Sequence, residues 1–171
     1  MSWIASSNRD VARRDARRRY VPLVSTIAAI LFAILPIVVT TPIVPDFAFL
    51  VLIAWRLLRP EMWTAQMALP LGLLNDLVDG LPLGQSMALW TLTFLAFDIL
   101  DARLNWRDYW MDWFFAALAI LTYSLAGWAI GRLMGNMASF TVLLPQIVLS
   151  VFLYPVVARI ILMLDRWRLA R

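Results

Sequence analysis

The chain has 171 residues, of which 63% are apolar, and it carries 15 basic and 11 acidic residues but no His and no Cys. A soluble domain has roughly 45–50% apolar residues, so this composition excludes an ordinary soluble domain, a disordered chain and a disulfide-bonded secreted module. It also excludes nucleophiles, general bases and metal sites built from His or Cys. We therefore expect an all-α integral membrane protein with no cofactor.

Six apolar stretches are predicted to be membrane-spanning helices. A spanning helix needs about 20 mostly apolar residues. The second stretch is shorter than this, and the third is interrupted by Pro70 and Gly72. In chain order, the predicted spans are 22–41, 43–58, 62–78, 83–100, 110–134 and 140–164.

The basic residues, which are all Arg, predict the orientation of these spans. Cytoplasmic loops of membrane proteins are enriched in Arg and Lys. With the N-terminus in the cytoplasm, six spans place fourteen Arg on the cytoplasmic side and only Arg132 outside. This pattern favours a membrane topology signal over a nucleic-acid surface, and membrane lipid is the expected contact of the basic tail. The predicted division is a basic cytoplasmic tail (1–21), a six-helix transmembrane domain (22–164) and a basic cytoplasmic C-terminus (165–171).

Four polar residues are expected at the outer end of the predicted spans. Asn75, Asp76 and Asp79 end the third span, and Asp46 begins the second at the same depth. For Asp79 we favour bonds to the backbone of the 76–84 turn together with an ion pair to Arg132. For Asp76, a role in the turn and a role in binding an ion, a polar ligand or a partner helix stay equally open.

Asp98 and Asp101 are expected at the opposite face of the membrane. They end a predicted helix, where the helix dipole disfavours carboxylates, so we expect Arg103, Arg107 or Arg159 to pair with them. Two-Asp intramembrane catalysis needs both carboxylates at one depth. Because Asp76 and Asp98 lie at opposite ends, we expect no catalytic residues.

Three glycines at four-residue spacing mark the fifth predicted span. Gly127, Gly131 and Gly135 are half of the six glycines in the chain. Glycines at this spacing clear one helix face so that another helix can approach closely. We expect a helix-packing face and favour a neighbour within the same chain over a second protein.

The region from 45 to 97 carries several motifs in a fixed order. It has Pro45-Asp46, then a short apolar span with Trp55, then the sequence Gly72-Leu-Leu-Asn-Asp76 and the turn Gly80-Leu-Pro-Leu-Gly84. In this order and spacing, the region resembles the rod shape-determining protein MreD. The resemblance implies a structural or partner-binding role for five residues: Pro45, Gly72, Asp76, Gly80 and Gly84. Their implied role is to hold the outer ends of the second to fourth spans, against which a membrane segment of a partner could pack.

The resemblance implies a non-catalytic scaffold of the cell-elongation complex in the bacterial inner membrane, involved in cell shape and peptidoglycan synthesis. It implies association with MreC and, directly or through MreC, with MreB, RodA and a penicillin-binding transpeptidase. It also implies a six-helix fold similar to the substrate-binding subunits of energy-coupling-factor transporters. The alternative is a vitamin-binding subunit of such a transporter, in which Asp46, Asn75, Asp76 and Trp90 would line a pocket.

Overall fold

The computed structural model describes residues 8–34, 44–103, 108–135 and 139–169. Within these ranges it contains six α-helices, three short 3-10 helices and no strand, which confirms the prediction of an all-helical chain. The α-helices are α1 (Asn8–Leu31), α2 (Phe47–Leu58), α3 (Ala65–Asp79), α4 (Gln85–Arg103), α5 (Tyr109–Leu133) and α6 (Leu144–Leu169). The 3-10 helices are η1 (Phe32–Ile34), η2 (Pro60–Met62) and η3 (Phe140–Val142).

The helices correspond to the six predicted apolar stretches but differ from them at the ends. The first α-helix begins fourteen residues earlier than the predicted span that starts at residue 22, because its basic N-terminal part is helical as well. Residues 35–43, which include the end of that predicted span, lie outside the described residues. Hydropathy locates the segment that partitions into lipid, whereas helix formation also depends on backbone propensity, which is high for Arg.

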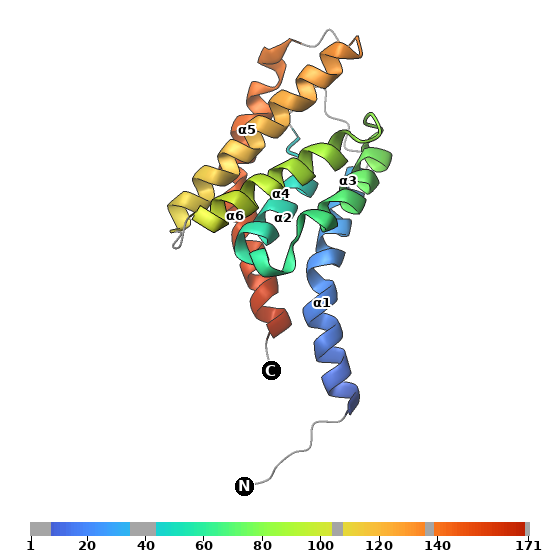
Figure 1. Ribbon diagram of the computed structural model, residues 1–171, viewed down its shortest axis with the longest axis vertical. Coiled ribbons are helices and arrows are strands. Elements are labelled where there is room, and N and C mark those ends of the chain that lie inside the picture. Colours follow the sequence, from blue (N-terminus) through green and yellow to red (C-terminus); the bar gives the residue numbers. More distant parts are fainter. Residues whose placement is uncertain (1–7, 35–43, 104–107, 136–138, 170–171) are drawn as a thin grey trace.

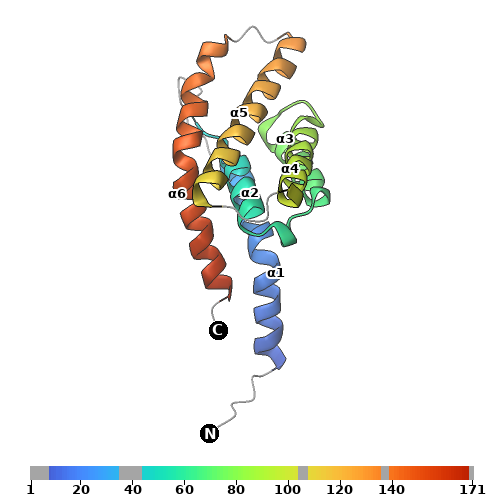
Figure 2. The same ribbon diagram turned by 60° about the vertical axis from the view of Figure 1, so that its left-hand side comes forward.

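The six helices form two hairpins around a short central helix (Figure 1). Helices α5 and α6 make one long hairpin and α3 and α4 make another, while α2 lies between them and packs against α1, α5 and α6. Figure 2 shows the start of α1 and the end of α6 at the same end of the molecule, opposite to the connection between α5 and α6.

Helix α2 forms the centre of the hydrophobic core. Nine of its twelve residues are buried, and Phe49, Leu52 and Trp55 are at most 1% exposed. Its 12 residues give a length of only about 18 Å, which is shorter than the hydrocarbon core of a bilayer, about 30 Å. The indole Nε1 of Trp55 donates to the hydroxyl of Ser25 on α1 over 2.8 Å, so the polar atom of this buried side chain is satisfied.

Large apolar side chains are exposed on the outer faces of α5 and α6. Phe114, Phe152 and Val156 are 63%, 68% and 52% exposed. Two segments, Tyr109–Leu133 and Phe140–Leu169, are long and apolar enough to cross a membrane. An exposed apolar surface of this extent is typical of helices that contact lipid.

Candidate functional site

A cavity of about 620 Å³ lies between the end of α1, the starts of α2 and α4, the end of α3, and helices α5 and α6. Its walls come from the end of α1, the first turn of α2, the last turn of α3, and the facing halves of α5 and α6. Ligand pockets in proteins typically measure about 300–1,000 Å³. The cavity is therefore large enough for a small molecule or for a side chain of a partner.

A chain of hydrogen bonds crosses three of the helices that enclose the cavity. The amide Nδ2 of Asn75 donates to the carboxylate of Asp79 over 3.0 Å and to the hydroxyl of Ser86 over 3.3 Å. The hydroxyl of Ser86 is also 3.2 Å from the phenol of Tyr123 on α5. Because the Asp79 carboxylate only accepts hydrogen bonds, the Asn75 amide must turn its NH2 group towards Asp79.

The carbonyl oxygen of that same amide has no partner. Asn75 is 0% exposed, and its Oδ1 has no donor within hydrogen-bonding distance. A buried polar atom without a hydrogen bond typically costs about 1–3 kcal/mol. Asn75 lines the cavity, so an occupant could supply the missing donor.

Asp46 lines the cavity from α2, where it is the N-cap residue. One of its carboxylate oxygens, Oδ1, accepts a hydrogen bond from the backbone N–H of Phe49 over 2.9 Å. This bond satisfies one of the free N–H groups at the start of the helix. Asp46 forms no ion pair with any of the described residues.

Aromatic rings and small residues complete the walls. The ring of Phe49 stacks on that of Tyr123 at 4.2 Å between centroids, and Trp128 lines the cavity from the next turn of α5. Gly127 and Gly131 lie on the same face of α5 and also line the cavity. A Cβ atom at Gly127 would meet the side-chain amide of Gln85 on α4 at 3.3 Å, so this part of the predicted glycine face packs within the chain.

Gly135 does not belong to that packing face. It follows the end of α5, and its φ of 92° lies in the left-handed region that favours glycine. Gly135 is therefore a turn residue. The spacing alone could not show that the helix ends at Leu133.

The connection between α3 and α4 is held by one carboxylate. Asp76 accepts a hydrogen bond from the backbone N–H of Gly84 over 2.8 Å and one from that of Ser86 over 2.7 Å. A side chain of α3 therefore caps the N-terminus of α4. Gly80 ends α3 with a φ of 65°, and Gly84 has a φ of 95°, so both glycines occupy left-handed turn positions. Of the two roles that the sequence left open for Asp76, this arrangement corresponds to the role in the turn.

Gly72 has a different function in the same hairpin. A Cβ atom at this position would lie 2.5 Å from Cα of Met87 on α4, which is far inside van der Waals contact. The backbones of α3 and α4 therefore approach as closely as they do only because residue 72 has no side chain. Pro45, the fifth position carried over by resemblance, is buried and lines the cavity next to Asp46.

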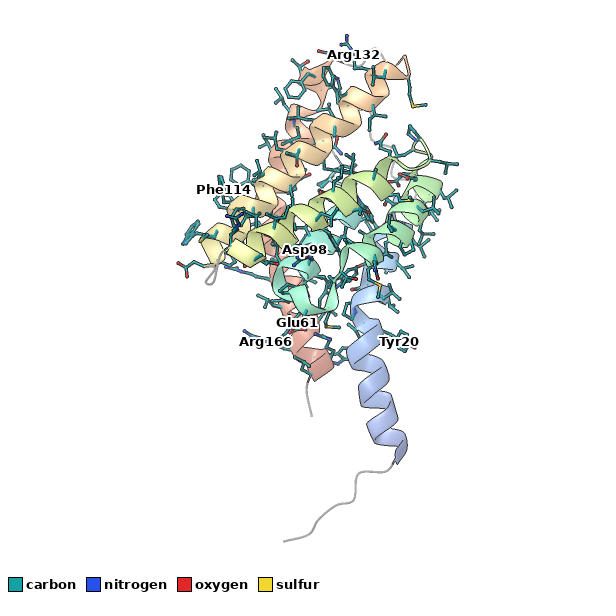
Figure 3. All side chains as sticks on the ribbon, in the orientation of Figure 1. Tyr20, Glu61, Asp98, Phe114, Arg132 and Arg166 are labelled. Atoms are coloured by element: carbon teal, nitrogen blue, oxygen red, sulfur yellow. The ribbon has the colours of Figure 1, made fainter. Side chains whose placement is uncertain are left out.

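The predicted ion pair between Asp79 and Arg132 is not found among the described residues. The Asp79 carboxylate accepts from Asn75, whereas the Arg132 guanidinium lies 5.3 Å from the ring centroid of Trp128. Figure 3 shows Arg132 at the far end of α5. A stack of Arg on Trp stabilises the charge without a carboxylate partner.

A second group of charged residues, here called the ion-pair cluster, lies nearer the end that holds the C-terminus of α6. It comprises Arg56, Arg59, Asp98, Asp101, Asp165 and Arg168. Figure 3 places Asp98, Glu61 and Arg166 well away from Arg132.

Arg56 is the central residue of the ion-pair cluster. Its side chain is 1% exposed, and its two terminal nitrogens donate to Asp98 and, over 2.9 Å, to Asp101. Asp98 and Asp101 were expected to pair with Arg103, Arg107 or Arg159, and the structure adds Arg56, which sequence reasoning did not name, as a partner of both. Arg107 lies outside the described residues.

Asp165 forms the other half of the ion-pair cluster. Arg59 donates to its Oδ2 over 2.7 Å, and Arg168 donates to its Oδ1 over 2.7 Å. The hydrogen bond from Arg59 to Asp165 raises the pKa of this arginine above its ordinary value. Sequence reasoning missed this site, although Asp165 and Arg168 have the three-residue spacing of a helical ion pair.

The described residues include no group of three or more Asp or Glu placed to hold a metal ion. Asp46 and Asp79 instead line the cavity, whereas Asp98, Asp101 and Asp165 are bound to arginines. Within these residues the geometry supports helix packing and the binding of a polar group.

We compared the sequence of the chain with models of protein families. The family model of the rod shape-determining protein MreD matches residues 16–164. The chain belongs to the MreD family. No curated protein and no solved structure matches it.

Membership of the MreD family makes this chain a rod shape-determining membrane protein. The MreD family is a family of structural, shape-determining proteins and is not known as an enzyme family. The match covers all the helices except the first turns of α1 and the end of α6. Of the residues around the cavity, sequence reasoning named Pro45, Asp46, Asn75, Asp79, Gly127 and Gly131 but missed Tyr123, Gln85 and Gln146. Asp76 and Trp90, which the transporter alternative also placed in a pocket, are not part of its walls.

Proposed function

We propose that the chain is a non-catalytic, multi-pass scaffold subunit of the cell-elongation complex in the bacterial inner membrane. The observation that carries this proposal is the MreD family match over residues 16–164. Shape determination through a membrane protein requires contact with other components, and the proposed direct contact is MreC. Through MreC the chain would be connected to MreB, RodA and the penicillin-binding transpeptidase, and so to peptidoglycan synthesis.

The proposed topology has six spans with both termini in the cytoplasm. Three observations support it. The start of α1 and the end of α6 lie at one end of the molecule (Figure 2). The ion-pair cluster contains three arginines, and Arg132 lies at the opposite end (Figure 3). Arginine enrichment on the cytoplasmic side orients membrane proteins. The basic segments 1–21 and 165–171 would then face the cytoplasm and anionic lipid, with 22–164 as the membrane domain in a fold similar to energy-coupling-factor substrate-binding subunits.

The proposed surface for MreC is the α3–α4 hairpin, whose turn is fixed by Asp76, Gly80 and Gly84. Leu83 at the tip of this turn is 71% exposed. An apolar residue held out on a rigid turn is suited to contact a membrane anchor or the segment next to it.

The test is depletion of the protein in the rod-shaped bacterium that produces it. The proposal expects round cells, restored to rods by the wild-type gene. Cells that keep their rod shape but require a vitamin would contradict it and would favour the transporter alternative, which the family match disfavours.

The partner is tested by co-purification of MreC with the full-length chain. Leu83→Asp is expected to lower the recovery of MreC severalfold without changing the melting temperature of the chain. Leu133→Asp is the matched control, because Leu133 is 88% exposed at the end of α5. Equal recovery of MreC with both variants would rule out the hairpin tip as its contact.

A further inference from the structure

The polar lining of the cavity is acidic and rich in hydrogen-bond acceptors. Asp46 and Asp79 supply carboxylates, and Asn75 supplies an amide oxygen that is fully buried and has no donor. Of the described residues that line the cavity, none is basic. A nearby cation stabilises the charged form of a carboxylate that lies near an apolar interior. Neither Asp46 nor Asp79 has a cationic partner among the described residues.

The apolar lining also suits a cation. The faces of Phe49, Tyr123 and Trp128 contribute aromatic surface to the walls. Aromatic rings attract ammonium and guanidinium groups placed over their faces, and Trp128 already holds the guanidinium of Arg132 in this way. A metal ion fits less well, because about 620 Å³ is far more than a bare ion fills and the described residues hold no set of metal ligands.

We propose that the cavity is a binding site for a primary ammonium group, which would donate to the Asn75 carbonyl oxygen and neutralise Asp46 and Asp79. A primary ammonium carries three N–H donors and one positive charge, which matches an unpaired amide oxygen beside two carboxylates. The group can belong to the headgroup of an amino-phospholipid or to a free organic amine. This inference goes beyond the scaffold function and does not depend on it.

The test uses the full-length chain in detergent with paired probes, in which N-acetylation removes the positive charge and the ammonium donors of the amine. Phosphatidylethanolamine is compared with its N-acetylated form by native mass spectrometry, and phenethylamine with N-acetylphenethylamine by calorimetry. At least one charged probe is expected to bind ten or more times tighter than its acetylated partner. Binding of the lipid alone identifies a headgroup, and binding of phenethylamine identifies a free amine.

Two variants locate the binding to the cavity. The double variant Asp46→Asn/Asp79→Asn retains the hydrogen-bond acceptors but removes both charges, so binding of the charged probe is expected to fall at least tenfold. Ser124→Phe leaves the charges and fills space in the cavity, and it is expected to weaken binding as much. Asp108→Asn is the matched control, since Asp108 is an exposed N-cap at the start of α5, and it is expected to leave binding unchanged.

Equal binding of charged and acetylated probes, or no binding of either, would overturn the proposal. Undiminished binding by a folded double variant or by Ser124→Phe would also overturn it, because the amine would then bind elsewhere. Cell shape is read in a separate experiment, so failure here and failure of the scaffold function are distinguishable.

Discussion

The cavity and the ion-pair cluster both contain aspartates, but the two regions satisfy these carboxylates differently. In the ion-pair cluster, Asp98 and Asp101 share Arg56, and Asp165 lies between Arg59 and Arg168. Around the cavity, Asp46 accepts a hydrogen bond from the backbone N–H of Phe49 and Asp79 accepts one from the amide of Asn75, and neither forms an ion pair with a described arginine.

The difference indicates which charges serve folding and which are free for binding. A carboxylate held by a buried arginine is part of the packing, and removing either partner leaves the other uncompensated. A carboxylate that has only neutral donors keeps its capacity to attract a cation. The same residue type therefore has a structural role in one region and a recognition role in the other.

The largest expected effect comes from removing the central residue of the ion-pair cluster. Arg56→Leu is expected to lower the free energy of unfolding by about 3 kcal/mol, because it removes the buried arginine that Asp98 and Asp101 share. Arg56→Lys should recover only part of this loss, since an ammonium lacks the planar fork that reaches both aspartates. Unfolding in mixed detergent micelles measures both changes. Arg159→Leu, at an exposed position, is the control, and an equal loss there would contradict the structural role of Arg56.

The second prediction concerns the close contact between α3 and α4. Gly72→Ala is expected to lower the free energy of unfolding by about 2–3 kcal/mol. The added Cβ atom would clash with the backbone of α4, and a side-chain movement cannot relieve that clash. Because α3 supplies Asn75 and Asp79 to the cavity and α4 supplies Asp98 and Asp101 to the ion-pair cluster, this variant should disturb both regions together. Gly127→Ala is the matched control, as its Cβ atom would meet only the mobile end of Gln85. Thermal unfolding measures both variants, and equal losses of melting temperature would contradict the packing argument.

The third prediction separates the two regions. Asp76→Ala is expected to lower the free energy of unfolding by about 2 kcal/mol. Helix α4 loses its cap, and the backbone N–H groups of Gly84 and Ser86 lose their acceptor. The amides of Gly84 and Ser86 should exchange hydrogen faster, while amides around Arg56 should be unaffected. Hydrogen exchange followed by mass spectrometry measures both. Unchanged exchange at Gly84 and Ser86 would show that Asp76 is not the cap.

The smallest expected effect is the most direct test of the comparison. Asp165→Asn is expected to lower the free energy of unfolding by about 1–2 kcal/mol, because the hydrogen bonds donated by Arg59 and Arg168 lose their negatively charged acceptor. Asp46→Asn should change stability by less than about 0.5 kcal/mol, because Asn caps a helix as well as Asp does. Melting temperatures of the two variants under one condition measure the difference. Equal losses would remove the distinction between structural and recognition carboxylates.

Local features could be predicted from the sequence better than distant contacts. The turn role of Asp76 depends on residues within ten positions, and the spacing of Asp76, Gly80 and Gly84 already suggests it. The partner of Asp98 and Asp101 could not be found in this way, because Arg56 is 42 and 45 residues away on a helix whose neighbours hydropathy does not reveal.

The cavity was predictable in part for the same reason. Asp46 and Asn75 stood out because ionisable and amide groups within apolar segments are uncommon. Tyr123 and Gln146 did not stand out, since their roles depend on the rotation of α5 and α6 about their own axes. Gly135 was assigned to a helix face because the sequence spacing continues past the residue at which the helix ends.

The cap that Asp76 places on α4 has a mechanical consequence. The end of α3 is bonded to the start of α4, and the absence of a side chain at Gly72 lets the two backbones come into contact, so the two helices are tied together at the turn and along their packing face. Its α4 carries Ser86 beside the cavity at one end and Asp98 and Asp101 at the other. A tilt of this hairpin that widens the cavity would therefore also shift the carboxylates that hold Arg56, so the cavity and the ion-pair cluster are geometrically linked.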